Sequence, residues 1–131
     1  MSINSRAKGA RIELEAAKYL TRLGWPTSRN ARNGLSKPDL ETPFVRLHLE
    51  VKGDQSIGLD TKALTAACDQ AKRDAITHDR ATWAVLWKVD RKGWRLTYPS
   101  AAWSMANPLQ AVYPTVAGDD DIKTVLTWLE G

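Results

Sequence analysis

Hydrophobic and polar residues follow a helical period in several segments of the chain. In residues 5–23, apolar and small side chains recur every three or four positions until Gly24 and Pro26 stop the pattern. Residues 60–78 repeat this spacing, and residues 121–129 repeat it over a shorter length. The pattern therefore predicts amphipathic helices in these segments.

Residues 44–52 follow a period of two, which is typical of a strand. On a strand, side chains two positions apart point the same way, so His48, Glu50 and Lys52 share one face. The opposite face is apolar and consists of Val45, Leu47, Leu49 and Val51. This alternation is the clearest strand signal in the chain.

Residues 82–89 form an almost continuous apolar run of strand length, which favours a central strand. A turn separates this run from a further short strand at residues 94–99. Helix, strand, helix, strands and helix in this order predict one α/β domain over residues 1–131, with a mixed sheet flanked by helices. Residues 99–131 are interpreted as a C-terminal extension of its core.

Composition narrows the class of protein. The chain has 131 residues and is 43% hydrophobic, enough for a core of its own. The single cysteine, Cys68, excludes an internal disulfide framework and a multi-cysteine zinc site, and fits a small core residue. The polar, basic N-terminus and the lack of a long apolar run indicate neither secretion nor membrane insertion. We therefore expect a cytoplasmic protein without a membrane partner.

Charge is unevenly distributed along the chain. The net charge is +4, and basic residues gather in the first third. Such a basic face is a candidate for DNA phosphate binding, although ordinary solvated charge explains it equally well. The candidate contacts are Lys8, Arg11, Arg29, Arg32 and Lys37. Near the other end, Asp119, Asp120 and Asp121 precede a predicted helix, where helix capping and the helix dipole account for them.

Two carboxylates and a lysine form the constellation with most chemical content. Asp39 follows Pro38, which favours extended backbone, so Asp39 is expected beside the strand that carries Glu50 and Lys52. With the backbone carbonyl of Val51, these carboxylates make a set of hard oxygen ligands that suits Mg²⁺. A neighbouring lysine can orient an attacking water molecule. The spacing alone also fits a solvated strand edge.

The sequence "PDL" followed by "LEVK" resembles the signature of the PD-(D/E)xK nuclease superfamily. The segment "KGARIELEAAKYLTRLGW" is similar to the first helix of archaeal-type Holliday-junction resolvases, and "GWRL" resembles a late strand of those enzymes. The resemblance covers roughly residues 6–98. It implies a restriction-endonuclease-like core, in which a mixed sheet is flanked by helices, and Mg²⁺-dependent cleavage of DNA, with Mn²⁺ as a substitute.

Site residues follow from this resemblance by position. It implies Glu13, Asp39 and Glu50 as metal ligands, together with the Val51 carbonyl, and Lys52 as the residue that orients water. Glu15 is the alternative to Glu13, and the spacing from the Lys-Gly pair favours Glu13. Two residues match supporting positions of the family, namely Ser36 in the loop, as a DNA contact, and Gln70 on the second helix, near the lysine.

The expected function is structure-selective cleavage of Holliday junctions or other branched DNA by a homodimer, in a bacterial, archaeal or phage-infected cell. A dimer is expected because two equivalent cuts across a junction need two sites related by a two-fold axis. Two alternatives stay open. One is a restriction-like or repair nuclease acting on duplex DNA, and the other is a nucleic-acid-binding protein without catalysis.

Overall fold

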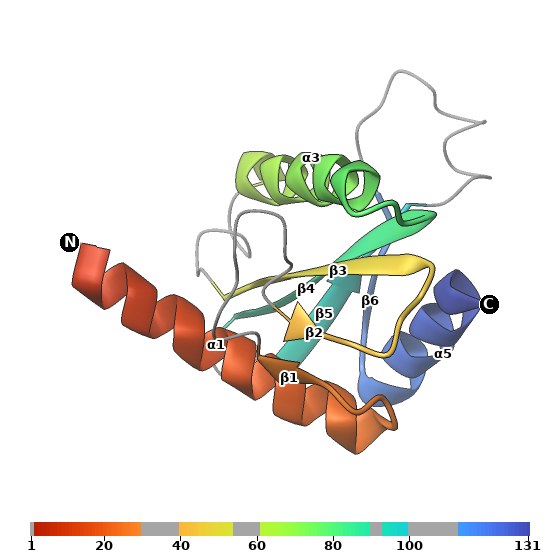
Figure 1. Cartoon of the computed structure of the whole chain (residues 1–131), viewed down its shortest axis with the longest axis horizontal. Helices are drawn as coiled ribbons and strands as arrows, with labels where there is room; N and C mark the ends of the chain where they lie inside the picture. Colours follow the sequence, from red (N-terminus) through yellow and green to blue (C-terminus); the bar gives the residue numbers. More distant parts are fainter. Residues whose placement is uncertain (1, 30–39, 54–60, 90–92, 100–112) are drawn as a thin grey trace.

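A four-stranded mixed sheet organises the computed structural model, which describes residues 2–29, 40–53, 61–89, 93–99 and 113–131. The strand order is β3-β4-β5-β6 (Figure 1). The strands comprise β3 (Leu47–Lys52), β4 (Thr82–Val89), β5 (Gly93–Thr97) and β6 (Thr115–Ala117). β3 and β4 are parallel, whereas β5 is antiparallel to both β4 and β6.

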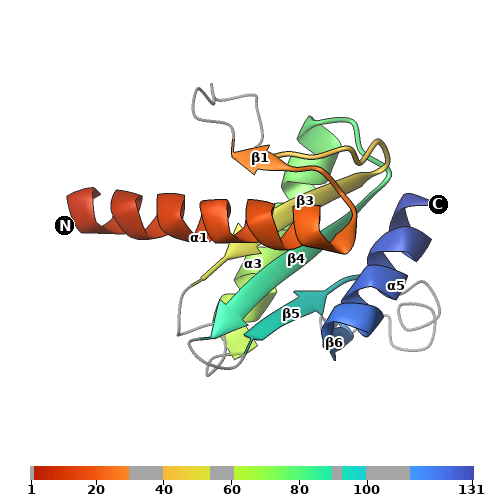
Figure 2. The ribbon, with the colours of Figure 1, turned by 90° about the horizontal axis from the view of Figure 1, so that it is seen from below.

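The helices cover both faces of this sheet. Helices α1 (Ser2–Leu23) and α5 (Asp119–Glu130) lie on one face, as Figure 2 shows, and α3 (Thr61–Thr77) lies on the other. Two short strands, β1 (Ser28–Arg29) and β2 (Leu40–Glu41), form a separate antiparallel pair. The predicted α/β class, with a mixed sheet flanked by helices, is confirmed.

The larger core fills the space between the sheet and helices α1 and α5. Its largest fully buried side chains are Leu20, Leu47, Leu86, Leu96, Ile122 and Leu126. Because Leu47 and Leu49 belong to this core, the apolar face of β3 points toward α1, as the alternation predicted. The polar face of β3 consequently points toward α3.

A smaller core lies between the sheet and α3. It is built from alanines of the helix and large side chains of β4, and the small alanine side chains let the helix approach the strands closely. Cys68 is buried in this cluster, which confirms its interpretation as a core residue. Its members are Ala67, Cys68, Ala71, Ala75, Trp83, Val85 and Trp87.

The predicted boundaries agree best with the structure for the central strand β4 and for helix α3. β4 has the predicted limits and is a central strand, and α3 lies within the predicted helix. β3, however, begins at Leu47 and not at Phe44. Phe44 is buried and Val45 is 71% exposed, so the predicted alternation is wrong for these two residues.

The C-terminal helix also departs from the sequence interpretation. Trp128 has a large apolar side chain that would fit a core position, but it is 60% exposed because Ile122, Leu126 and Leu129 form the buried face of α5. Asp119 accepts a hydrogen bond from the Tyr19 hydroxyl at 2.8 Å instead of capping the helix. Of the helices that the structure describes, none combines the length and hydropathy needed to cross a bilayer.

Candidate functional site

Strand β3 carries Glu50 and Lys52 on the face that points toward α3, as the period of two predicted. Glu50 is partly buried, and its side chain is 12% exposed. Lys52 lies at the end of the strand and is intermediate in exposure. Among the described residues, its ammonium group takes part in no ion pair. One strand face therefore presents a partly buried carboxylate and an ammonium group two residues away.

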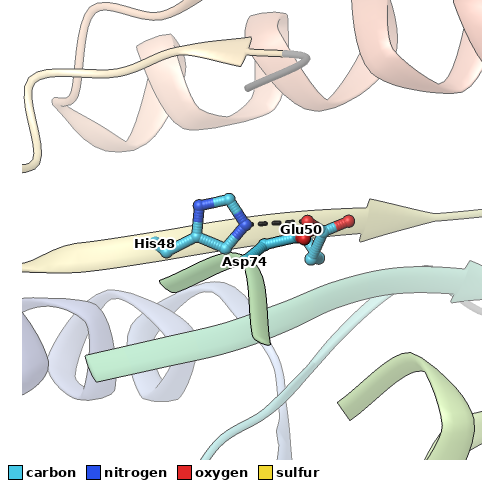
Figure 3. A group of neighbouring side chains, drawn as sticks. All are labelled: His48, Glu50 and Asp74. Atoms are coloured by element: carbon cyan, nitrogen blue, oxygen red, sulfur yellow. Dashed lines mark hydrogen bonds and ion pairs between the residues drawn. The ribbon is translucent and has the colours of Figure 1, made fainter. Parts of the chain in front are cut away.

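Glu50 lies in a group of potential metal ligands formed by His48, Glu50 and Asp74 (Figure 3). Each residue offers one ligand atom, and these atoms lie within 4.8 Å of one another. The distance between His48 Nε2 and Glu50 Oε1 is 2.7 Å. His48 and Glu50 come from β3, whereas Asp74 comes from α3, so the group joins the strand to the helix that covers it.

Asp74 is ionised more readily than an ordinary aspartate. Burial alone would raise the pKa of its carboxyl group. Hydrogen bonds with Glu50 and Gln70 and the nearby charges of His48 and His78 outweigh burial and lower the pKa below its usual value. The Asp74 carboxyl group therefore keeps its negative charge to a lower pH than an ordinary aspartate.

Gln70 lies one helical turn before Asp74 and holds its carboxylate in place. Gln70 Nε2 donates a hydrogen bond to Asp74 Oδ1 at 2.9 Å, and Arg73 Nη2 donates to Gln70 Oε1 at 2.9 Å. The structure thus connects Gln70 to the carboxylate group that contains Glu50. Its participation in the chemistry stays a prediction.

Glu13 lies on α1, on the opposite side of the sheet from α3. Its carboxylate accepts a hydrogen bond from Arg29 Nε at 3.0 Å, and its side chain is 16% exposed. The adjacent Ile12 packs against Gly53, directly after Lys52, so closely that Gly53 has no room for a Cβ atom. This contact brings the Glu13 turn of α1 to the end of β3, although Glu13 is not a member of the His48 group.

Glu15 has a different surrounding from Glu13. Its carboxylate accepts a hydrogen bond from Lys88 Nζ at 3.3 Å, and the same ammonium group lies 5.4 Å from the centre of the Trp94 ring. Glu15 thus forms an ion pair with Lys88 of β4, and its side chain is 43% exposed. The two candidate glutamates of α1 thus have separate cationic partners, and the choice of Glu13 over Glu15 stays a prediction.

The basic residues of the first third are placed in part. Arg11 is exposed on α1, and Lys18, Arg22 and Arg29 line a groove of about 460 Å³ between α1 and β1. Arg29 is also the partner of Glu13, so the groove adjoins that carboxylate. The other predicted residues, Asp39, Arg32, Ser36 and Lys37 and the side chain of Lys8, lie outside the described part of the structure.

Two residues of the His48 group have no role in the sequence prediction. The strand period places His48 on the same face as Glu50, and in the structure it is 5% exposed and hydrogen-bonded to Glu50. The only signal for Asp74 is its place four residues after Gln70, which puts both on one face of the helix.

Comparison with known proteins finds a distant likeness to a solved structure. No protein-family model matches the sequence, and no curated protein matches it. The chain is similar in structure to Hjc, a Holliday junction resolvase of the archaeal hyperthermophile Archaeoglobus fulgidus, with 18% sequence identity and a TM-score of 0.46. The similarity covers 90% of this chain and 88% of that one.

Proposed function

We propose that this protein is a metal-dependent DNA endonuclease that cleaves Holliday junctions or other branched DNA. The observation that carries the proposal is the position of Glu50. Its carboxylate is partly buried, lies beside the Asp74 carboxylate, and shares a strand face with Lys52. A solvated strand edge, the alternative interpretation of this spacing, would leave Glu50 exposed.

The donor chemistry at Glu50 fits a divalent cation. Adjacent carboxylates repel each other unless a proton or a cation offsets their charge, and carboxylate oxygens are the ligands that Mg²⁺ prefers. In the proposed enzyme Asp39, Glu50, the Val51 carbonyl and Glu13 hold Mg²⁺, for which Mn²⁺ can substitute. A bound Mg²⁺ supplies positive charge for the phosphate oxygens and lowers the pKa of a water molecule.

The other residues position the substrate and the nucleophile. The Lys52 ammonium group orients the attacking water and offsets charge on the phosphate. Arg11 and the groove lined by Lys18, Arg22 and Arg29 bind the DNA backbone beside the Glu13 turn. The predicted contacts Lys8, Arg32, Ser36 and Lys37 extend this surface. Two copies related by a two-fold axis provide the paired cuts that a four-way junction needs.

The experiment that tests this proposal compares DNA forms. A labelled four-way junction, linear duplexes with the sequence of its arms, and the corresponding single strands are incubated with the protein, with and without Mg²⁺. Preferential cleavage of the junction in Mg²⁺ is expected. Equal cleavage of the linear duplexes would identify an ordinary duplex nuclease, and salt-sensitive binding without cleavage of any form would identify a binding protein.

A further inference from the structure

We propose that His48, Glu50 and Asp74 form a second cation site, for a borderline divalent ion of the Zn²⁺ or Co²⁺ class, on the α3 side of β3. This site goes beyond the nuclease activity and rests on different ligands, except for Glu50, which both sites share. Its distinguishing feature is a nitrogen ligand, the imidazole of His48.

The geometry is close to that of a bound ion. Zn²⁺ binds imidazole nitrogen and carboxylate oxygen at about 2.0–2.2 Å, which places neighbouring ligand atoms about 3.0–3.5 Å apart. The three ligand atoms lie within 4.8 Å of one another, and the closest pair, His48 Nε2 and Glu50 Oε1, is 2.7 Å apart. This closest contact is a hydrogen bond, so an ion that binds here takes the place of the proton between His48 and Glu50, with Asp74 as the third ligand.

The ligands are held by the surrounding structure. His48 is 5% exposed, and its ring stacks on His78 with ring centres 5.4 Å apart. Asp74 is held by Gln70, which in turn accepts a hydrogen bond from Arg73. Polar groups that hold ligands in this way are typical of protein metal sites, because they fix ligand orientation before the ion binds.

The ligand types set the preference for the ion. Mg²⁺ prefers oxygen ligands and keeps several waters, whereas imidazole suits Zn²⁺ and similar ions. A set of one imidazole and two carboxylates leaves coordination positions open for water. The site therefore selects Co²⁺ or Zn²⁺ over Mg²⁺, and His48 is the residue that makes the difference.

The test is a titration of the full chain with Co²⁺ in the absence of DNA, followed by visible absorption, with Zn²⁺ and then Mg²⁺ as competitors. Saturable binding of one Co²⁺ per chain is expected, displaced by Zn²⁺ and not by a hundredfold excess of Mg²⁺. His48→Gln and Asp74→Asn should each weaken Co²⁺ binding at least about tenfold. Absence of saturable binding by the wild-type protein would overturn the proposal.

A matched control separates the ligands from general effects on the fold. Asp69→Asn removes an exposed acidic residue of α3, the helix that carries Asp74. This variant should bind Co²⁺ within about twofold of wild type, because Asp69 does not belong to the group. A loss in Asp69→Asn as large as in Asp74→Asn would overturn the ligand assignment. If His48→Gln does not fold, Asp74→Asn decides, because its amide keeps the shape of the carboxylate.

The outcome is independent of the nuclease proposal. Asp39→Asn should remove cleavage and leave Co²⁺ binding unchanged, because Asp39 is not a ligand of this second site. Junction cleavage by a protein that does not bind Co²⁺ at His48 would overturn the second site alone. Co²⁺ binding that depends on His48, in a protein that cleaves no DNA, would overturn the nuclease proposal alone.

Discussion

The two faces of the sheet differ in polarity. The buried residues between the sheet and helices α1 and α5 are all apolar or aromatic. The α3 face contains both buried polar residues of the described chain, His48 and Thr97. Thr97 belongs to this face because it lies opposite Val85, a member of the α3 core. One face thus provides apolar burial, whereas the other combines burial with polar groups.

The polar groups of the α3 face have partners that offset their burial. Thr97 Oγ1 accepts a hydrogen bond from Trp87 Nε1 at 3.0 Å and lies 2.7 Å from Thr115 Oγ1. His48 is bonded to Glu50. Burying such groups without partners would cost about 1–3 kcal/mol each. The difference teaches that the face under α1 and α5 buries chiefly apolar side chains, whereas the α3 face also holds buried polar and ionisable groups.

Glu50→Gln is the substitution expected to have the largest effect. It removes the charge with which Glu50 would hold Mg²⁺ in the proposed enzyme, with almost no change in shape, so junction cleavage should fall at least about a hundredfold. Single-turnover cleavage measures the loss, and circular dichroism with junction binding checks that fold and affinity are kept. Glu15→Gln, which changes an exposed carboxylate on α1, is the matched control. Mg²⁺-dependent cleavage at the wild-type rate in Glu50→Gln would contradict the site assignment.

Leu20→Ala tests the structural role of the opposite face. Leu20 is fully buried in the core under α1, so its truncation should lower the free energy of unfolding by about 2–5 kcal/mol. Leu14→Ala, on the same helix but 48% exposed, should change it by less than about 0.5 kcal/mol. Urea unfolding measures both variants. If this face is purely structural, the folded fraction of Leu20→Ala cleaves at the wild-type rate.

Glu13→Gln tests whether the apolar side of the sheet also contributes to the site. If the Glu13 turn reaches the end of β3, loss of this carboxylate should reduce cleavage about tenfold, less than the loss of Glu50. Glu15→Gln should have little effect, because Glu15 is paired with Lys88. Cleavage rates at saturating Mg²⁺ distinguish the two variants. The reverse ranking would show that the wrong glutamate of α1 was chosen.

Elements with strong local patterns were the ones that sequence could predict. The limits of β4 follow from an apolar run buried on both faces, and α3 follows from its helical spacing. The start of β3 could not be found in this way. Three backbone N–H groups, those of Val45, Arg46 and Leu47, donate to the Glu130 carboxylate at 2.7–3.1 Å, and their partner lies more than 80 residues away.

The candidate site was predictable to a similar extent. The strand period placed Glu50 beside His48 and Lys52, because that relation is local. Asp74 meets Glu50 only because α3 packs on β3 at one particular rotation and height, which alanines such as Ala71 and Ala75 permit. The sequence alone determines neither the rotation nor the height of α3 on the strand. The residue that completes the ligand group therefore had to come from the tertiary structure.

Tyr19→Phe is expected to have the smallest effect, on the apolar side of the comparison. The buried Tyr19 donates its hydroxyl hydrogen to the exposed Asp119 at 2.8 Å, linking α1 to the start of α5. Loss of this bond should cost about 1 kcal/mol, because Asp119 can be hydrated by solvent afterwards. Arg22→Gln removes an exposed ion pair at 3.5 Å to the same carboxylate and a guanidinium group that lies 5.2 Å from the centre of the Tyr19 ring, and it should cost less.

The pH dependence of the stability difference between wild type and Tyr19→Phe identifies the Tyr19 hydroxyl as its source. Burial, followed by the hydrogen bond and the charge of Asp119, raises the pKa of Tyr19 above its ordinary value. A raised pKa in the folded state gives stability that is complete below the unfolded value of about 10 and is lost as the pH rises beyond it. The advantage of wild type over Tyr19→Phe in urea should therefore be constant from about pH 6 to 9 and shrink above about pH 10. A difference that stays constant above pH 10 would show that the Tyr19 hydroxyl is not the source of this stability.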